Sequence, residues 1–295
     1  MVPDPAADAT NTVQLPDSRE LAYAETGDPD GVPVVFCHGT PGSRRSAALA
    51  ADAAAAVGAR VLAPDRPGFG ESDRHPGRGF ADWAADVAAF ADELGVEEYA
   101  VVGFSGGGPY ALACAAHTPD RVRRCAVVSG VGPPGSERGD LGFEYVLAAA
   151  SRVSPQFGRP LVWLMRRAVA SADSFTDVAG EPETDLADPR RGETGRVLLA
   201  DFREGLRQGT TPLATDYGVL YDAWDFDLAD VAAPTRVFHG EDDANVPLAA
   251  AERVADELPD ADCTVYADAG HFHPVVEEAR DVYGWAVGAE NASDE

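Results

Sequence analysis

The chain of 295 residues is long enough for one large α/β domain with an insertion, and no apolar stretch in it reaches the length of a membrane span. Its 50 acidic residues against 23 basic ones give a formal charge of -27, which argues against nucleic acid or an anionic membrane as partners. The acidic N-terminus lacks the basic and apolar regions of a secretory signal and also a twin arginine, so we expect a cytoplasmic protein.

Short apolar runs alternate with helical stretches in the first half of the chain. This alternation is typical of a largely parallel sheet with helices on both faces. The first two runs lie on either side of Pro16-Asp17-Ser18-Arg19 and predict an antiparallel hairpin. In chain order, the predicted strands are 12–15, 21–25, 33–37, 60–63, 98–102 and 125–128, and the predicted helices are 44–57, 80–94 and 107–117.

Residues 132–230 interrupt this alternation. They open with Gly132-Pro133-Pro134-Gly135 and carry helical patterns at 160–165 and 197–202, but no run typical of a buried strand. We therefore predict a mostly helical insertion that sits over the sheet as a cap.

The alternation resumes after the insertion, which completes a predicted sheet of eight strands. The remaining strands are expected at 235–238 and 263–266, and the remaining helices at 247–257 and 274–287. The predicted division is a core of residues 1–131 and 231–290, a cap of residues 132–230, and a polar tail of residues 291–295.

The pentapeptide Gly103-Phe104-Ser105-Gly106-Gly107 lies between a predicted strand and a predicted helix. G-x-S-x-G in this context predicts a nucleophile elbow, a turn so sharp that the serine takes a strained backbone conformation. Glycines flank the serine because neighbouring chain passes too close for a Cβ atom. A glycine-rich turn with an incidental serine, or one that binds phosphate, is the alternative interpretation of this pattern alone.

A serine nucleophile needs a histidine base within hydrogen-bond reach, and the histidine needs a carboxylate to orient it. The loops after the last two predicted strands supply both groups. One loop carries Asp242 and Asp243, and the other carries His271 and His273. The order serine, aspartate, histidine along the chain is the one that this strand–helix architecture requires.

These motifs resemble those of the α/β-hydrolase fold in its capped, single-domain form, over residues 12–287. In that family the acid is the fourth residue of a G-x-x-D-x-x-V-P segment, which corresponds to Asp243 rather than Asp242. The family histidine follows a glycine near the C-terminus, which corresponds to His271 rather than His273. The resemblance therefore implies a catalytic triad of Ser105, Asp243 and His271.

The segment His38-Gly39-Thr40-Pro41-Gly42 is similar to the family loop that supplies an oxyanion donor. The resemblance implies that the backbone N–H groups of Thr40 and Gly106 form the oxyanion hole. His38 is expected to organise this loop rather than to act as a base. Asp65 opens a segment similar to the family's D-x-x-G-x-G-x-S loop and is expected to be structural.

The residue at the elbow is Ser105, whereas family members that open epoxides or remove halides carry an aspartate there. The resemblance thus implies acyl transfer through an acyl-enzyme, on a small carboxylic ester or a related acyl compound. The alternatives are a cofactor-free C–C bond hydrolase, a perhydrolase, an aminopeptidase, or a binding protein without catalysis. No metal-ligand cluster or dinucleotide fingerprint is present in the sequence, so no cofactor is implied.

Four cysteines match no zinc or redox spacing and are expected to be buried free thiols; they are Cys37, Cys114, Cys125 and Cys263. Three further histidines are expected at the surface or behind the site, with no evident partner; they are His75, His117 and His239.

All 23 basic residues are arginines, and the acidic residues are spread over the whole chain. This composition resembles that of proteins from salt-loving organisms, including halophilic archaeal members of the hydrolase family. An ordinary acidic protein from a GC-rich genome is the alternative. We expect adaptation to salt, because an acidic tail would instead concentrate the charge locally.

Overall fold

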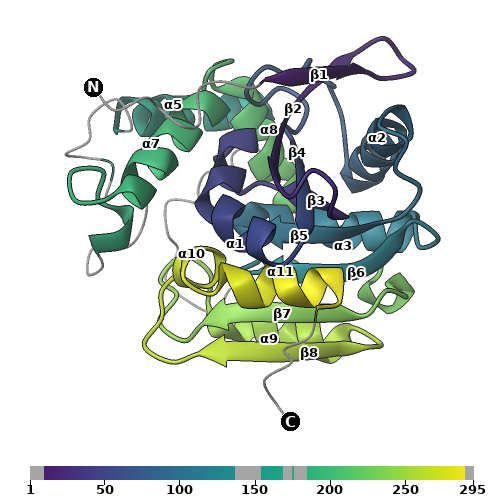
Figure 1. Cartoon of the computed structure of the whole chain (residues 1–295). Coiled ribbons are helices and arrows are strands. Elements are labelled where there is room, and N and C mark those ends of the chain that lie inside the picture. Colours follow the sequence, from purple (N-terminus) through teal and green to yellow (C-terminus); the bar gives the residue numbers. More distant parts are fainter. Residues whose placement is uncertain (1–9, 137–153, 169–174, 176–184, 290–295) are drawn as a thin grey trace.

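The computed structural model describes residues 10–136, 154–168, 175 and 185–289 of the chain (Figure 1). An eight-stranded sheet runs through it in the order β1-β2-β4-β3-β5-β6-β7-β8. Strand β2 pairs antiparallel with β1 and with β4, and all other neighbours are parallel. The predicted hairpin and the mostly parallel eight-stranded sheet are confirmed. The strands are β1 (Asn11–Gln14), β2 (Glu20–Gly27), β3 (Val32–Cys37), β4 (Ala59–Pro64), β5 (Tyr99–Phe104), β6 (Val122–Val128), β7 (Thr235–Gly240) and β8 (Ala261–Tyr266).

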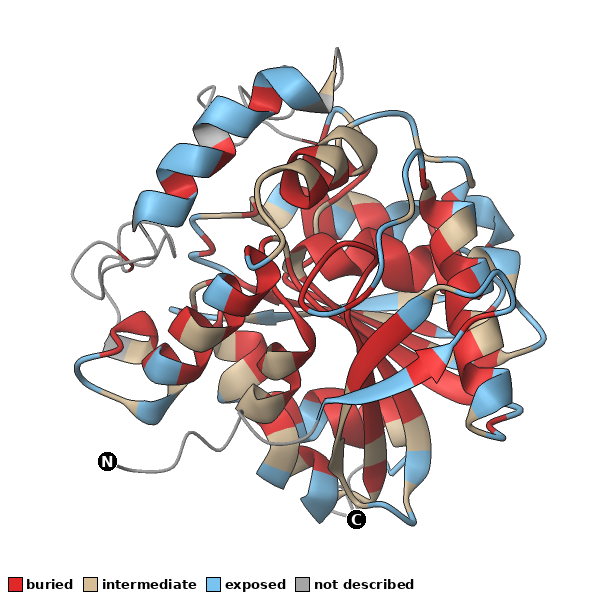
Figure 2. Ribbon diagram, turned by 90° about the horizontal axis from the view of Figure 1, so that it is seen from above, coloured by how far each residue is buried: buried red, intermediate tan, exposed pale blue. Residues whose placement is uncertain are grey.

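Helices cover both faces of the sheet, as the alternation predicted. Side chains alternate along a strand, so Val34 packs into one hydrophobic cluster and Val35 into the other. The first cluster includes side chains of α1 (Ala51–Ala56) and α11 (Ala279–Val287). The second includes side chains of α2 (Phe80–Glu93), α3 (Gly108–His117) and α9 (Leu248–Glu257). Figure 2 shows the central strands buried between these layers.

Two predicted helices differ from the structure in their detail. The predicted helix 44–57 begins as a 3₁₀ helix, η1 (Arg44–Ala50), whose first turn is held by hydrogen bonds to Ser43 and Asp201, and becomes α-helical only in α1. The predicted helix 274–287 divides into α10 (His273–Val276) and α11, because the N–H of Glu278 reaches back to the carbonyl of His273 in a wide turn.

The described residues between β6 and β7 form helices and no strand. They are α5 (Pro155–Ala168), η3 (Asp185–Ala187), α7 (Glu193–Gly205), α8 (Thr211–Leu220) and η4 (Leu228–Asp230). Residues 137–153, 169–174 and 176–184 of the predicted cap lie outside the described part of the chain. Figure 1 shows α5 and α7 on the side toward which the parallel strands point. None of the described helices is both long and apolar enough to cross a bilayer.

Asp201 attaches helix α7 to the loop that follows β3. Its carboxylate is buried and accepts hydrogen bonds from the backbone N–H groups of Ser43 (2.8 Å) and Ser46 (3.1 Å) and from the Ser43 hydroxyl (2.7 Å). Burial raises the pKa of Asp201 to about 7, although these hydrogen bonds oppose the shift.

This raised pKa predicts a pH-dependent stability. The folded protein keeps the Asp201 proton up to about pH 7, whereas the unfolded chain releases it near its ordinary pKa of 3.8, so the contribution of Asp201 to stability is lost as pH rises between these values. Asp201→Asn cannot ionise and should gain in melting temperature relative to wild type as pH rises through this window. Thermal unfolding of both proteins at several pH values measures the difference between their melting temperatures. A difference that stays constant with pH would contradict the prediction.

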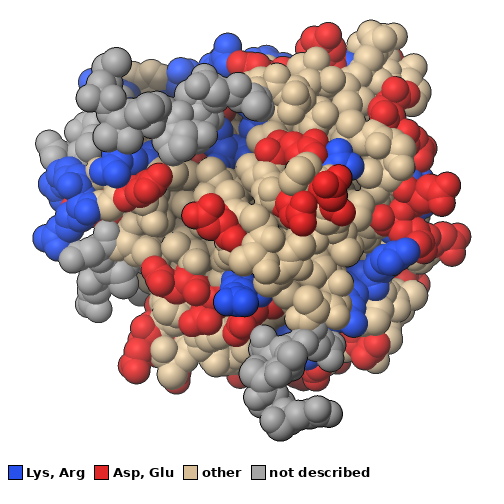
Figure 3. Space-filling model, viewed as in Figure 1, with Lys and Arg blue, Asp and Glu red and all other residues tan. Residues whose placement is uncertain are grey.

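Three of the four cysteines are buried, as predicted, and all four are free. Cys263 is exposed, so the expectation that it is buried is wrong. It lies on β8, the last strand in the order of the sheet, where the exposure of side chains is highest among the parallel strands. Acidic side chains are scattered over the face of the molecule in Figure 3 rather than gathered in one patch.

Candidate active site

The chain turns sharply at Ser105, between β5 and α3. The residue has a φ of +53°, in the left-handed region that costs a residue with a side chain about 1–3 kcal/mol. It begins a single 3₁₀ turn, η2 (Ser105–Gly107), which leads directly into α3. The sharp, strained turn predicted from G-x-S-x-G is therefore present.

Close backbone approaches explain the glycines around this turn. A Cβ atom on Gly103 would lie 2.4 Å from the carbonyl oxygen of Gly107, and one on Gly107 would lie 2.0 Å from the carbonyl oxygen of Cys37. Both separations are far inside van der Waals contact. Alanine at Gly103 would force the turn itself open, and alanine at Gly107 would force the elbow away from the end of β3.

His271 and Asp243 form a buried pair at the carboxyl ends of β7 and β8. The Nδ1 atom of His271 lies 2.8 Å from Oδ2 of Asp243, so the carboxylate holds the ring proton on Nδ1 and leaves Nε2 as the basic nitrogen. The other carboxylate oxygen accepts the N–H groups of Asn245 and Val246, both at 2.8 Å. Burial raises the pKa of Asp243, but the His271 ring and these hydrogen bonds together lower it below its ordinary value.

The two competing positions lie elsewhere. Asp242 is exposed, although it neighbours Asp243. His273 contacts Glu278 at 3.3 Å through its Nε2 atom and begins α10. The structure thus brings Asp243 and His271 together.

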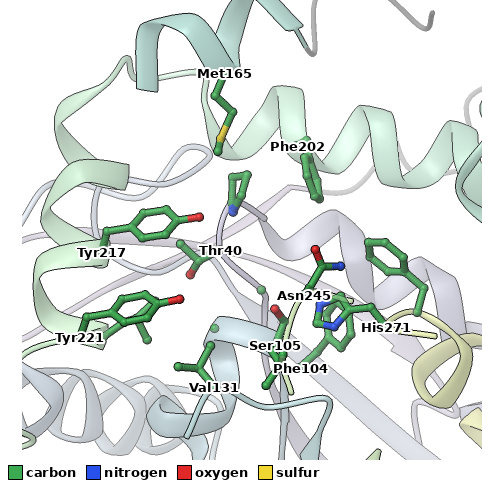
Figure 4. Close-up of a pocket in the computed structure, with 16 residues that line it drawn as sticks. Thr40, Phe104, Ser105, Val131, Met165, Phe202, Tyr217, Tyr221, Asn245 and His271 are labelled. Atoms are coloured by element: carbon green, nitrogen blue, oxygen red, sulfur yellow. The ribbon is translucent and has the colours of Figure 1, made fainter. Parts of the chain in front are cut away.

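Ser105 and His271 line the same pocket, which has about 600 Å³ of empty space with its mouth included (Figure 4). Thr40 and Gly106 line it as well, and Gly106 directly follows Ser105. A Cβ atom on Gly106 would lie 3.2 Å from the backbone nitrogen of Thr40, so the two expected oxyanion donors are close neighbours. All five residues predicted for the site therefore converge.

His38 organises the loop that carries Thr40, as predicted. Its Nε2 accepts the backbone N–H of Arg66 at 3.0 Å, so the ring proton is on Nδ1, which donates to the carbonyl of Gly39 at 2.8 Å. Burial and the nearby Arg66 hold the pKa of His38 well below its ordinary value, so the ring is neutral. Asp65, also predicted to be structural, is buried and binds a guanidinium nitrogen of Arg44 at 2.5 Å.

Comparison with known sequences decides the family. The sequence profile of the alpha/beta hydrolase fold matches residues 32–277, which is most of the chain. The chain belongs to the α/β-hydrolase family.

Several curated relatives and solved structures are similar to this α/β hydrolase. A non-heme chloroperoxidase from Streptomyces lividans is 32% identical over 90% of this chain and 95% of its own. A 2-hydroxymuconate semialdehyde hydrolase from Pseudomonas putida is 27% identical over 82% of each chain. The esterase from Exiguobacterium antarcticum superposes with a TM-score of 0.71 over 96% of this chain and 100% of its own, and at 18% identity it supports the fold alone. These relatives are bacterial, so they lend no support to the archaeal, salt-adapted resemblance.

The helices between β6 and β7 supply one wall of the hydrolase pocket. Met165 comes from α5, Phe202 from α7, and Tyr217 and Leu220 from α8, with Tyr221 directly after it (Figure 4). These side chains could not be predicted from the sequence, because their helical pattern is the same for a core helix as for a pocket wall. Asn245, also in the lining, follows Asp243 by two residues, and this spacing is a signal that could have indicated it.

Two histidines of this α/β hydrolase have partners that were not predicted. His239 is fully buried on β7, where its Nε2 lies 2.9 Å from the carbonyl oxygen of Val246 and 3.5 Å from Oδ2 of Asp243. Burial lowers its pKa, so it packs behind the acid as a neutral ring. His117 contacts Asp225 at 3.3 Å near the end of α3. Over the described ranges, no three His, Cys, Asp or Glu side chains are grouped to hold a metal ion.

Proposed function

We propose that this α/β hydrolase is a serine esterase that cleaves small, uncharged carboxylic esters through an acyl-enzyme. Ser105 would be the nucleophile, His271 the general base and acid, and Asp243 the residue that orients His271. The N–H groups of Thr40 and Gly106 would bind the oxyanion. The observation that carries the proposal is Ser105 on a strained turn in the same pocket as a histidine whose Nδ1 is bound to a buried carboxylate.

The proposed reaction has two halves. Oγ of Ser105 attacks the ester carbonyl carbon while Nε2 of His271 takes the hydroxyl proton of Ser105. The tetrahedral oxyanion accepts hydrogen bonds from the two backbone N–H groups. Collapse of this tetrahedral intermediate breaks the ester C–O bond, and His271 gives the proton to the leaving alcohol. Water then attacks the acyl carbon with His271 as base, and the carboxylic acid and free Ser105 are released.

The lining of the pocket supports an uncharged substrate. Of the sixteen described residues around it, none is Asp, Glu, Lys or Arg, and five are Phe or Tyr. We also propose that residues 132–230 act as a cap, because Met165, Phe202 and Tyr217 face the same space as Ser105. The cap would select the substrate by shape and apolar contact.

A C–C bond hydrolase and a perhydrolase would use the same triad on different reactants. The Pseudomonas relative is named for 2-hydroxymuconate semialdehyde, a compound with a carboxylate, and the described lining here has no arginine to pair with a carboxylate. This favours a neutral ester over a C–C bond hydrolase. The identity to a chloroperoxidase supports perhydrolysis as the second candidate, in which hydrogen peroxide replaces water at the acyl-enzyme and forms a peracid.

A panel of p-nitrophenyl esters of graded acyl length tests the proposal, together with labelling by a fluorophosphonate probe. We expect the probe to modify Ser105 in the folded enzyme. Short acyl chains should be hydrolysed fastest, because the space of about 600 Å³ includes the open mouth and the enclosed part holds only a small acyl group. No adduct on Ser105 would favour a binding protein without catalysis. Peracid formation from acetate and peroxide, or turnover of a ring-opened dienoate, would favour the corresponding alternative, and proline release from a peptide would favour an aminopeptidase.

We further propose that the acidic composition is an adaptation to salt. With a formal charge of -27, the excess acidic side chains repel one another at low ionic strength, and added ions screen that repulsion. The melting temperature should therefore climb as potassium chloride is raised from low to molar concentration. Thermal scans over this range measure it, and a flat melting temperature would indicate an ordinary acidic protein.

A further inference from the structure

A buried cluster of charges lies directly behind the loop that carries Thr40. It contains two guanidinium groups, Arg66 and Arg78, one carboxylate, Asp216, and the phenol of Tyr110. Arg78 is 3% exposed and the other three are 0% exposed. Asp216 belongs to α8, in the proposed cap, whereas the other members belong to the core.

Asp216 is the centre of this cluster. Its Oδ1 accepts hydrogen bonds from Nη2 of Arg78 at 2.5 Å and from the Tyr110 hydroxyl at 2.7 Å. Its Oδ2 accepts from Nη2 of Arg66 at 2.9 Å and from the Thr40 hydroxyl at 2.6 Å. Burial raises the pKa of Asp216, but the two arginines hold it far below its ordinary value, so the carboxylate is ionised. A buried anion with four donors holds each of them in place.

Arg66 extends from this carboxylate to the backbone of the loop. Its Nη2 donates to the carbonyl oxygen of Gly39 at 2.9 Å, and its Nη1 donates to the carbonyl oxygen of His38. The carbonyl of Gly39 and the N–H of Thr40 belong to one planar trans peptide, so they point in opposite directions. A guanidinium fixed on the carbonyl side therefore sets where the N–H points.

We propose that Asp216 and Arg66 are positioning residues of the oxyanion hole. Asp216 holds Arg66 against the Gly39–Thr40 peptide and binds the Thr40 hydroxyl, and together these contacts aim the Thr40 N–H at the oxyanion. A residue of the cap thus sets a catalytic donor of the core, on the same helix that presents Tyr217 to the pocket. This inference rests on the proposed function, since it concerns the oxyanion of that reaction.

Asp216→Asn tests the proposal. Asparagine has nearly the same shape, but it is neutral and places an N–H₂ group against two guanidinium groups. With p-nitrophenyl butyrate, we expect kcat to fall by about tenfold to a hundredfold, which is less than the loss of a whole oxyanion donor, while KM changes by less than about threefold. Affinity for butylboronic acid, whose adduct with Ser105 mimics the tetrahedral anion, should fall in the same proportion as kcat.

Asp201→Asn is the matched control. Asp201 is also a buried carboxylate that joins a helix of the proposed cap to the loop after β3. Its partners are Ser43 and Ser46, and it makes no hydrogen bond to Arg66 or Thr40. Its kcat and boronate affinity should stay close to wild type. Equal losses in both variants would indicate general loosening of the loop and would overturn the proposal. So would a lower melting temperature of Asp216→Asn with unchanged kcat and boronate affinity.

Tyr110→Phe covers the case in which Asp216→Asn fails to fold. It removes one of the four hydrogen bonds to the carboxylate and the one that Tyr110 accepts from Nη1 of Arg78, while both arginines keep their own hydrogen bonds to Asp216. We expect a smaller fall in kcat, again matched by boronate affinity, and unchanged values would overturn the proposal. Fluorophosphonate labelling of wild-type Ser105 separates failure of the proposed function from failure of this inference. An unlabelled serine would contradict both the esterase proposal and this inference. A labelled serine with unaffected variants would contradict this inference alone.

Discussion

Replacing Ser105 with alanine should abolish ester hydrolysis and leave the fold intact. Without Oγ no acyl-enzyme can form, so kcat should fall by about 10⁴- to 10⁶-fold, with only the oxyanion hole and binding left to act on the ester. The substitution removes a single oxygen from the lining of the pocket and keeps the Cβ atom, so the backbone strain at this position is unchanged. Turnover of p-nitrophenyl butyrate and the melting temperature are the measurements.

Ser129→Ala is the matched control for this variant. Ser129 also has a positive φ, of +47°, and directly follows a central strand, β6. Its buried hydroxyl donates to the backbone carbonyl of His271 at 2.9 Å, so its loss weakens one support of the histidine without removing a reacting atom. Activity should fall far less than in Ser105→Ala. Retained turnover in Ser105→Ala, or equal losses in the two variants, would overturn the assignment of the nucleophile.

Asp243→Asn should be far more damaging than Asp242→Asn. The carboxylate of Asp243 lies 2.8 Å from Nδ1 of His271 and holds the ring proton there, and in the proposed mechanism it stabilises the imidazolium that forms during attack. An amide can instead donate to Nδ1, which moves the ring proton to Nε2 and leaves no base facing Ser105. We expect kcat to fall by about 10³- to 10⁴-fold.

Asp242 provides the control within the same loop. It is exposed and has the same side chain at the neighbouring position, so Asp242→Asn should keep nearly wild-type kcat. Comparing kcat of the two variants with one ester gives the ranking directly. The reverse ranking would show that the acid of the triad is Asp242, and equal, small effects would show that neither carboxylate orients the histidine.

Much of the fold and the candidate site could be predicted because their causes are local in the sequence. Apolar alternation identified the strands before and after residues 132–230, since a strand buried on both faces needs a short apolar run whatever lies beside it. The elbow was equally predictable, because Gly103 and Gly107 are required by backbone atoms within and next to the turn. The choice of Asp243 over Asp242 followed from its place in a motif, and the structure places Asp243 against His271.

The errors and omissions concern contacts between distant segments. His239 looked unpartnered in sequence, although β7 buries it behind Asp243. Asp216 had no motif to mark it, because its partners Arg66 and Thr40 lie 150 and 176 positions away along the chain. The pocket wall was missed for the same reason, since Met165 and Phe202 meet Ser105 only after the chain has folded.

The amino-acid sequence by itself determined the groups on which the proposed chemistry of this hydrolase depends: a serine on a turn that only glycines permit, with a histidine and an aspartate on later loops. Glycine spacing and strand order impose these features through steric contacts of a few residues. The tertiary structure alone decided how the loop that carries Thr40 is supported and what shapes the pocket. Those features depend on buried charges and apolar side chains from separate helices. Such groups contribute to stability and to the shape of the site only when packing removes them from water.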